Sequence, residues 1–204
     1  MINRELYMEQ ITPFIDKPFV KVITGIRRCG KSVVLRLIRE ELLRRGVSED
    51  YIIYMNFESF EWIDMKEAKA LYAHIREATK ASGKYYILLD EIQEVTDWEK
   101  AVNAFLVDLD VDIYVTGSNS RLLSSEFSTY LAGRYVAFHI MTLSFREYLL
   151  FHDLPLTISV SDRKTEFLKY LRMGGFPAIH TANYDYNAIY KIVYDIYSSV
   201  ILRD

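Results

Sequence analysis

An eight-residue segment near the start of the chain has the residue types and the spacing that bind phosphate. It reads Gly25-Ile26-Arg27-Arg28-Cys29-Gly30-Lys31-Ser32, a complete match to the pattern G-x-x-x-x-G-K-[ST]. Glycines let the backbone turn tightly enough for successive N–H groups to face an anion, and a helix starting near Ser32 adds its positive end. Lys31 can reach β- and γ-phosphates, and the Ser32 hydroxyl can ligate Mg²⁺. The segment from Gly25 to Val33 therefore predicts a nucleotide phosphate site.

Two arginines and a cysteine inside this segment leave alternatives open. Arg27 and Arg28 could neutralise phosphate or bind an acidic partner, or their side chains could point to solvent while only their backbone contributes. Cys29 lies beside Lys31 and a predicted helix start, and both features favour a reactive thiolate. It could equally be a small buried side chain that fills space.

A pair of acidic residues follows the most apolar predicted strand. Asp90 and Glu91 come directly after the run Tyr85–Leu89, and a carboxylate at the end of a parallel strand meets the phosphate crevice of an α/β sheet. Because side chains alternate along a strand, we expect Asp90 to hold Mg²⁺ through water while Glu91, on the other side, polarises the attacking water. The second acid favours a hydrolase over a nucleotide kinase. A solvated acidic turn is the alternative for both residues.

Another predicted strand ends in the polar run Thr116-Gly117-Ser118-Asn119. In additional-strand ATPases the fourth strand inserts between the first and the third, so that its end lies beside the γ-phosphate. In that arrangement Ser118 or Asn119 would sense the phosphate or orient water. A plain turn is the alternative.

Strand and helix signals alternate up to residue 141. Short β-branched or apolar runs predict five strands, at 19–24, 51–57, 85–89, 111–115 and 135–141. Helical spacing of apolar residues predicts helices at 32–45, 64–78, 96–109 and 122–131. The pairs Asp64 with Glu67 and Thr96 with Glu99 predict capping boxes at two of these helix starts. We therefore predict an α/β fold, a P-loop NTPase with a five-stranded parallel sheet covered on both faces.

After Ser144 the pattern becomes helical, with segments predicted at 145–151, 163–173 and 186–202. We therefore divide the chain into a P-loop core at residues 1–143 and a small helical lid at residues 144–204. Because the last apolar helical pattern stops at Asp204 without a capping glycine, we expect the lid to be truncated from a longer protein.

Composition excludes several other classes of protein. The 204 residues are 50% apolar and 26% charged, which is typical of a globular chain. A net charge of −3 gives no basic field, so nucleic-acid binding is possible but is not indicated by charge. One cysteine excludes an internal disulfide framework. The N-terminus has no signal-peptide core, and no run approaches the ~18 apolar residues that span a bilayer, so we expect a cytoplasmic protein without a membrane partner.

Several motifs together resemble the prokaryotic AAA-type ATP-binding proteins of the AAA+ superfamily. The resemblance covers essentially the whole chain and is far more specific than the phosphate motif alone. It is carried by the phosphate segment with its two arginines, Leu89-Asp90-Glu91-Ile92-Gln93-Glu94-Val95 with Trp98, Thr116-Gly117-Ser118-Asn119-Ser120, Gly133-Arg134, Leu143-Ser144-Phe145-Arg146-Glu147-Tyr148, and Gly174-Gly175-Phe176-Pro177.

The resemblance implies a sheet of the AAA+ type followed by a helical lid, with ATP and Mg²⁺ as ligands. It also implies a C-terminal domain that this chain lacks. Oligomeric AAA+ ATPases take an arginine finger from about the position of Arg134, so the resemblance suggests a homo-oligomer in which Arg134 acts on a neighbour's γ-phosphate. A structural ion pair is the other interpretation of Arg134.

Three functions remain in competition. The first is an ATP hydrolase that drives a switch or motor for an unidentified partner, which the second acid Glu91 and the strand count favour. The second is a nucleotide-binding scaffold with little turnover. The third is a P-loop small-molecule kinase, which phosphate transfer to an acceptor would reveal.

Overall fold

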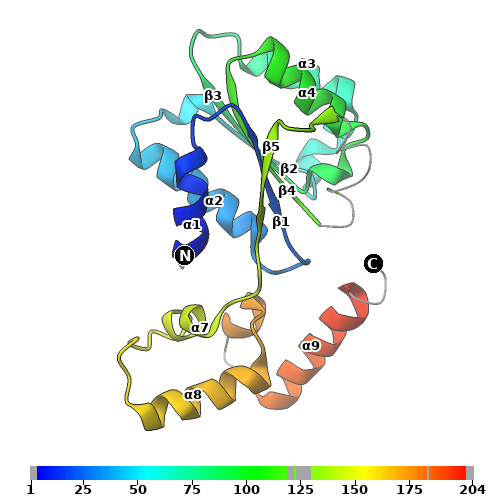
Figure 1. Ribbon diagram of the computed structural model, residues 1–204. Helices are drawn as coiled ribbons and strands as arrows, with labels where there is room; N and C mark the ends of the chain where they lie inside the picture. Colours follow the sequence, from blue (N-terminus) through cyan, green and yellow to red (C-terminus); the bar gives the residue numbers. More distant parts are fainter. Residues whose placement is uncertain (1–3, 119–121, 123–129, 183, 201–204) are drawn as a thin grey trace. The chain divides into compact units, whose positions relative to one another are not determined.

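The computed structural model describes residues 4–118, 122, 130–182 and 184–200, and its chain divides into two compact units (Figure 1). We call the described residues within 5–25 and 31–139 the sheet unit, and those within 1–4, 26–30 and 140–204 the helical unit. The first phosphate-loop residue, Gly25, and Lys31 thus belong to the sheet unit, and the five residues between them belong to the helical unit.

The sheet unit is built on five parallel strands. They are β1 (Val20–Thr24), β2 (Ile52–Asn56), β3 (Tyr85–Asp90), β4 (Val111–Gly117) and β5 (Tyr135–His139). Their order is β2-β3-β4-β1-β5, and every neighbouring pair is parallel. The predicted five-stranded parallel sheet is confirmed, as is the insertion of the fourth strand between the first and the third.

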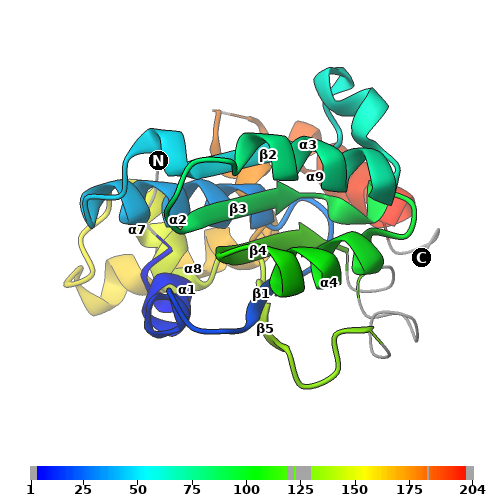
Figure 2. The ribbon, with the colours of Figure 1, turned by 90° about the horizontal axis from the view of Figure 1, so that it is seen from above.

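Helices cover both faces of this sheet. Figures 1 and 2 show α1 (Glu5–Ile11) and α2 (Lys31–Arg44) on one face, and α3 (Ala68–Ala78) and α4 (Trp98–Asp108) on the other. Strands β1 and β3 are buried along their whole length, because a parallel sheet between two helical layers exposes neither face. Short 3-10 helices lie at Thr12–Phe14, Glu49–Tyr51, Phe60–Met65 and Ile92–Glu94.

Both predicted capping boxes in the sheet unit are wrong. Helix α3 begins at Ala68 and α4 at Trp98, and neither has a side-chain cap. The reason is a parallel β-bridge between Glu67 and Thr96, in which Ala68 N–H donates to Thr96 O and Thr96 N–H donates to Lys66 O. This pairing engages the backbone just before both helices, where Glu67 is extended and Asp97 is left-handed, so a contact between distant segments overrides the local signal. Most of the helix predicted at 122–131 lies outside the described residues.

The helical unit contains α7 (Phe145–Phe151), α8 (Val160–Met173), the 3-10 helix Pro177–His180 and α9 (Tyr186–Val200). Helix α7 begins with a capping box: Ser144 Oγ accepts from Glu147 N–H, and the Glu147 carboxylate accepts from Ser144 N–H. The backbone at Gly175 is close to Leu143, whose N–H donates to Gly175 O. A side chain on Gly175 would meet Leu143 O at 2.5 Å, so the turn requires glycine there. In the described part of the chain, no helix is long and apolar enough to cross a membrane.

Candidate functional site

Asp90 is the last residue of β3, and two neighbouring strands hold its carboxylate. The register pairs Asn56 of β2 with Asp90, and it pairs Leu89 with Val115 of β4, which brings Thr116 beside Asp90. Thr116 Oγ1 donates to Asp90 Oδ1 at 2.5 Å, and the Tyr54 hydroxyl donates to Oδ2 at 3.0 Å. Burial and the charge of Asp90 raise the pKa of Tyr54, so the phenol stays protonated and keeps donating. The fully buried carboxylate is therefore fixed in position.

Glu91 lies beyond the strand end and adopts a left-handed backbone conformation, with φ 54° and ψ 48°. Strand alternation therefore does not set the direction of its side chain, contrary to our expectation; the turn sets it. Glu91 N–H donates to Thr116 Oγ1 at 2.9 Å, so one threonine hydroxyl bonds both acidic residues. Left-handed conformations are unfavourable for residues other than glycine and cluster at functional sites.

Lys31 begins helix α2 and meets Glu91 in the sheet unit. Its ammonium lies 3.4 Å from Glu91 Oε1 and donates to Gly25 O at 3.3 Å, while the side chain is only 3% exposed. These distances exceed the usual N–H···O range of about 2.7–3.2 Å.

Gln93 is a site residue to which we assigned no role from the sequence. Its Nε2 donates to Glu91 Oε2 at 2.6 Å, which fixes the second oxygen of that carboxylate. Among the described residues, Gln93 Oε1 is a buried side-chain atom without a hydrogen-bond partner. A side chain on Gly117 would collide with this oxygen and with Leu122, so Gly117 makes room for the glutamine. The glutamine stands within the segment Leu89–Val95 that carries the family resemblance, but only the turn after β3 brings its side chain against Glu91.

The phosphate loop has a backbone that depends on glycine at two places. Gly25 has φ 151° and Gly30 has φ 104°, both in the region that favours glycine, and Arg28 has φ 65°. The side chains of Ile26, Arg27 and Arg28 are exposed, whereas Cys29 is buried. Ser32 and Val33 lie half-buried in the first turn of α2.

The other predicted residues lie at separate places. Ser118 is half-buried directly after β4, and Asn119 lies outside the described residues. Arg134 is exposed before β5, where its Nη1 donates to Asn103 Oδ1 of α4 at 2.9 Å.

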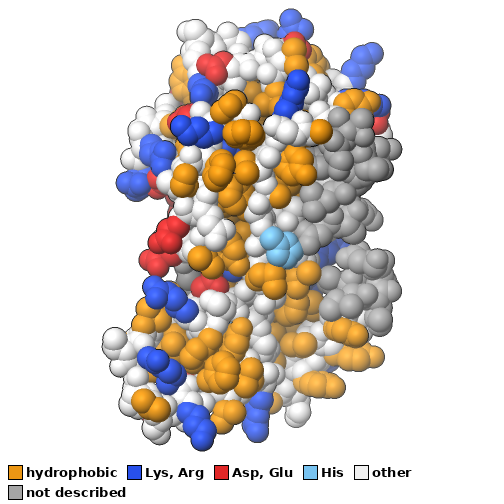
Figure 3. Space-filling model, in the orientation of Figure 1, with side chains coloured by type: hydrophobic (Ala, Val, Ile, Leu, Met, Phe, Trp, Pro, Cys, Tyr) orange, Lys and Arg blue, Asp and Glu red, His pale blue; other side chains and the backbone are white. Residues whose placement is uncertain are grey.

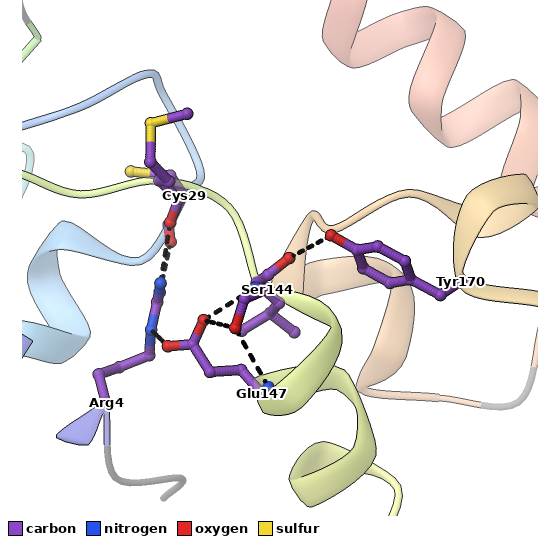
Figure 4. A network of polar contacts seen from close by, with 7 residues as sticks. Arg4, Cys29, Ser144, Glu147 and Tyr170 are labelled. Atoms are coloured by element: carbon purple, nitrogen blue, oxygen red, sulfur yellow. Dashed lines mark hydrogen bonds and ion pairs between the residues drawn. The ribbon is translucent and has the colours of Figure 1, made fainter. Parts of the chain in front are cut away.

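Arg4 is a further residue that the sequence reasoning missed. Within the helical unit its guanidinium contacts the backbone of Cys29 and the carboxylate of Glu147 (Figure 4). The available signal was the S-x-x-E pattern at Ser144 and Glu147, which predicts a helix start but says nothing of the arginine.

Among the described residues on the face drawn in Figure 3, lysine and arginine side chains are scattered among hydrophobic and acidic ones and form no extended field of one charge. This agrees with the net charge of −3. Exposed hydrophobic side chains of the helical unit include Val160, Leu168 and Leu171 of α8 and Tyr190 of α9.

Comparison with known protein families matches residues 17–149 to the AAA domain. An uncharacterised protein of Haemophilus influenzae is 41% identical over 205 residues, covering 100% of this chain and 50% of that protein. An uncharacterised protein of Methanocaldococcus jannaschii is 34% identical over 209 residues, covering 100% of this chain and 44% of that protein. The chain thus spans about half the length of the curated relatives it matches.

Two solved structures share the fold. AMPPCP-bound DnaA from Aquifex aeolicus superposes with a TM-score of 0.56 at 15% identity, covering 95% of this chain and 62% of that chain. A DNA polymerase III gamma subunit-related protein from Thermotoga maritima gives a TM-score of 0.51 at 17% identity, covering 81% of this chain and 57% of that chain. At these identities the likeness concerns the fold, and function has to be argued from the site itself.

Proposed function

We propose that this chain, which belongs to the AAA domain family, binds ATP with Mg²⁺ and hydrolyses it as a switch or motor for a partner. The observation that carries the proposal is the arrangement of three residues at one edge of the sheet. Lys31 is ion-paired with Glu91, and Glu91 follows the buried, doubly hydrogen-bonded Asp90. Family membership supports nucleotide binding, and the acidic pair supports hydrolysis.

The phosphates are assigned to the segment from Gly25 to Val33. Its backbone N–H groups and the start of helix α2 favour an anion, and Lys31 supplies the positive charge for the β- and γ-phosphates. The position of Lys31 at the start of α2, with its ammonium at Gly25 O and Glu91, supports this assignment.

The residues present fit a magnesium ion. Mg²⁺ prefers hard oxygen ligands and keeps several waters, so it requires only one or two protein ligands beside substrate phosphates. We assign it to the Ser32 hydroxyl and the Asp90 carboxylate. Among the described residues, each carboxylate oxygen of Asp90 accepts from one donor, which leaves a further lone-pair site for the ion or its water. When bound, the ion neutralises charge on the β- and γ-phosphate oxygens.

Glu91 is assigned as the group that orients and deprotonates the attacking water. Its two oxygens contact Lys31 and Gln93, so the carboxylate has a defined position. Gln93 Oε1 beside it has no hydrogen-bond partner among the described residues, which supports a water at this place, since a buried amide oxygen is stabilised by a hydrogen bond. We keep Ser118 and Asn119 as candidates to sense the γ-phosphate, and Arg134 as a candidate finger in a homo-oligomer.

The experiment that tests this function measures ATP binding by calorimetry and phosphate release from the same protein, with and without Mg²⁺. Mg²⁺-dependent binding with phosphate release to water supports the proposal. Tight binding without release supports a scaffold, and transfer of the γ-phosphate to an added acceptor supports a kinase. Repeating the assay with DNA, RNA and cell lysate searches for the partner.

Replacing Asp90 with asparagine is expected to remove most of the benefit that Mg²⁺ gives to ATP binding. The amide keeps the size of the side chain, and the Thr116 and Tyr54 hydroxyls can reorient toward it, so the fold survives. Losing one charge-assisted contact weakens the Mg²⁺-dependent gain in affinity by about tenfold. Titrations with and without Mg²⁺ measure this.

Asp108→Asn is a matched control for Asp90→Asn, because Asp108 also accepts from a tyrosine hydroxyl, that of Tyr72 at 2.6 Å, but is exposed on α4. The control should retain the wild-type Mg²⁺ dependence. An equal gain from Mg²⁺ in Asp90→Asn and wild type would remove Asp90 from the metal site.

A further inference from the structure

The helical unit is formed from three separate stretches of chain, and a side chain of the first stretch forms hydrogen bonds with the other two. Arg4 belongs to the first stretch, Cys29 to the phosphate loop, and Met141 and Glu147 to the third. Arg4 Nη1 donates to Cys29 O at 3.0 Å, Nη2 to Met141 O at 2.9 Å, and Nε to Glu147 Oε1 at 2.5 Å (Figure 4). Every nitrogen of the guanidinium therefore has an acceptor, and the side chain is only 3% exposed.

We propose that Arg4 is a positioning residue for the phosphate site. Its guanidinium fixes the Cys29–Gly30 peptide and links this peptide to the start of helix α7. This role rests on the proposed function, since it concerns the loop assigned to the phosphates. Arg4 lies well outside the motif in sequence and donates to a backbone carbonyl of the loop, that of Cys29.

The geometry of one peptide group explains how a distant arginine can act on the phosphate loop. A peptide is planar and trans, so its C=O and N–H point in opposite directions. Because Arg4 donates a hydrogen bond to Cys29 O, the N–H of Gly30 points away from Arg4. In a phosphate loop that N–H is one of the groups presented to the anion. By holding the carbonyl, Arg4 sets the orientation of a phosphate donor.

Gly30 itself shows how closely the guanidinium approaches the loop. A Cβ on Gly30 would lie 3.3 Å from Arg4 Nη1 and 3.9 Å from Pro177 Cγ, and Gly30 has φ 104°. The backbone conformation therefore favours glycine, and the guanidinium packs closely against it.

We call the hydrogen-bonded link from Cys29 through Arg4 to Glu147 the tether. Its end at Glu147 is rigid because both oxygens of that carboxylate accept hydrogen bonds. Its Oε1 receives Arg4, and its Oε2 accepts from the backbone N–H and the hydroxyl of Ser144 in the capping box of α7. Leu143, the residue before Ser144, is fixed in turn, because the Tyr170 hydroxyl of α8 donates to Leu143 O at 2.8 Å. Lysine cannot replace Arg4 here, because a single ammonium on a flexible stem cannot match three acceptors in a fork arrangement.

The loop can be observed directly by nuclear magnetic resonance. The chain has one cysteine, so protein carrying ¹³C-carbonyl cysteine and ¹⁵N-glycine gives a single carbonyl–amide correlation, that of the Cys29–Gly30 peptide. A hydrogen bond deshields a carbonyl carbon, and Arg4→Lys is expected to move the Cys29 carbonyl resonance upfield in protein without nucleotide. Under the same conditions the dissociation constant for ATP should rise by about tenfold, as for one weakened charge-assisted hydrogen bond.

Two further variants complete the experiment. Arg4→Met combined with Glu147→Gln removes the arginine without leaving a buried carboxylate unpaired, and should show the same upfield shift if Arg4→Lys folds poorly. Arg163→Lys is the control, because exposed Arg163 of α8 also donates to a backbone carbonyl, that of Leu156 at 2.9 Å, and should leave both readouts unchanged.

The outcomes separate this inference from the proposed function. An unchanged Cys29 carbonyl resonance in both Arg4 variants overturns the tether. A shifted resonance with ATP affinity within about threefold of wild type overturns the positioning role. If wild-type protein binds no ATP while the resonance still responds to Arg4, the proposed function fails and the tether stands. A shifted resonance with weakened ATP binding supports both.

Discussion

Replacing Glu91 with glutamine is expected to lower the rate of ATP hydrolysis by about 10²-fold or more while ATP still binds. Glutamine keeps the size of the side chain and can still accept from Gln93, but it cannot take a proton from water. The change also removes the carboxylate 3.4 Å from the Lys31 ammonium, so this ammonium no longer shares its charge with a protein anion. ATP affinity should therefore equal that of the wild type or exceed it.

Glu94→Gln is the matched control for Glu91→Gln. Glu94 stands on the same short helical turn and lies 3.9 Å from a different lysine, Lys66, so its change alters net charge equally. Steady-state phosphate release and calorimetric ATP binding measured on both variants separate chemistry from binding. Hydrolysis by Glu91→Gln at the wild-type rate would show that Glu91 is not the base. An equal loss of binding and hydrolysis would instead make Glu91 a structural partner of Lys31.

The parts of the site that could be predicted are those encoded in continuous stretches of sequence. The phosphate segment combines glycines, Lys31 and Ser32 within eight residues, and Asp90 follows an apolar run that is buried along its length. Strand and helix periodicity gave the five parallel strands, because a buried parallel strand and an amphipathic helix impose different spacings on apolar residues. The comparison with additional-strand ATPases supplied the insertion of the fourth strand between the first and the third, which periodicity alone does not determine.

The parts that could not be predicted depend on contacts between distant segments. The bridge between Glu67 and Thr96 moved two helix starts away from their local capping signals. Thr116 bonds Asp90 and Glu91 only because the sheet register brings β3 beside β4. Arg4 and Glu147 are 143 residues apart in the chain. Neither spacing nor residue type marks such pairs before the fold is known.

The positive φ of Glu91 is another feature that the strand pattern concealed. Alternation predicted that Asp90 and Glu91 would point to opposite faces, but β3 ends at Asp90 and the chain turns at the next residue. The turn is what brings the Glu91 carboxylate to Lys31 and Gln93, while Asp90 stays bonded to Tyr54 and Thr116. The two acids still serve different partners, for a different reason from the one expected.

Replacing Lys31 with alanine is expected to weaken ATP–Mg²⁺ binding by about 10²-fold or more, to the limit of detection in calorimetry. The ammonium is the charged donor that the sheet unit places at the end of the phosphate segment, and the structure holds it by long contacts to Gly25 O and Glu91. Lys69→Ala, at an exposed position on α3, should bind ATP like the wild type. Binding by Lys31→Ala within about threefold of the wild type would contradict the phosphate-loop assignment.

A second variant decides whether Lys31 acts on the nucleotide or only on its protein partner. Lys31→Ala leaves the Glu91 side chain, which is 9% exposed, without its ammonium, and a buried unpaired carboxylate destabilises the fold and repels phosphate. Combining Lys31→Ala with Glu91→Gln removes that charge as well. If Lys31 binds the phosphates, the double variant should recover thermal stability while ATP binding stays at the limit of detection. Recovery of ATP binding in the double variant would show that the lysine serves only to neutralise Glu91.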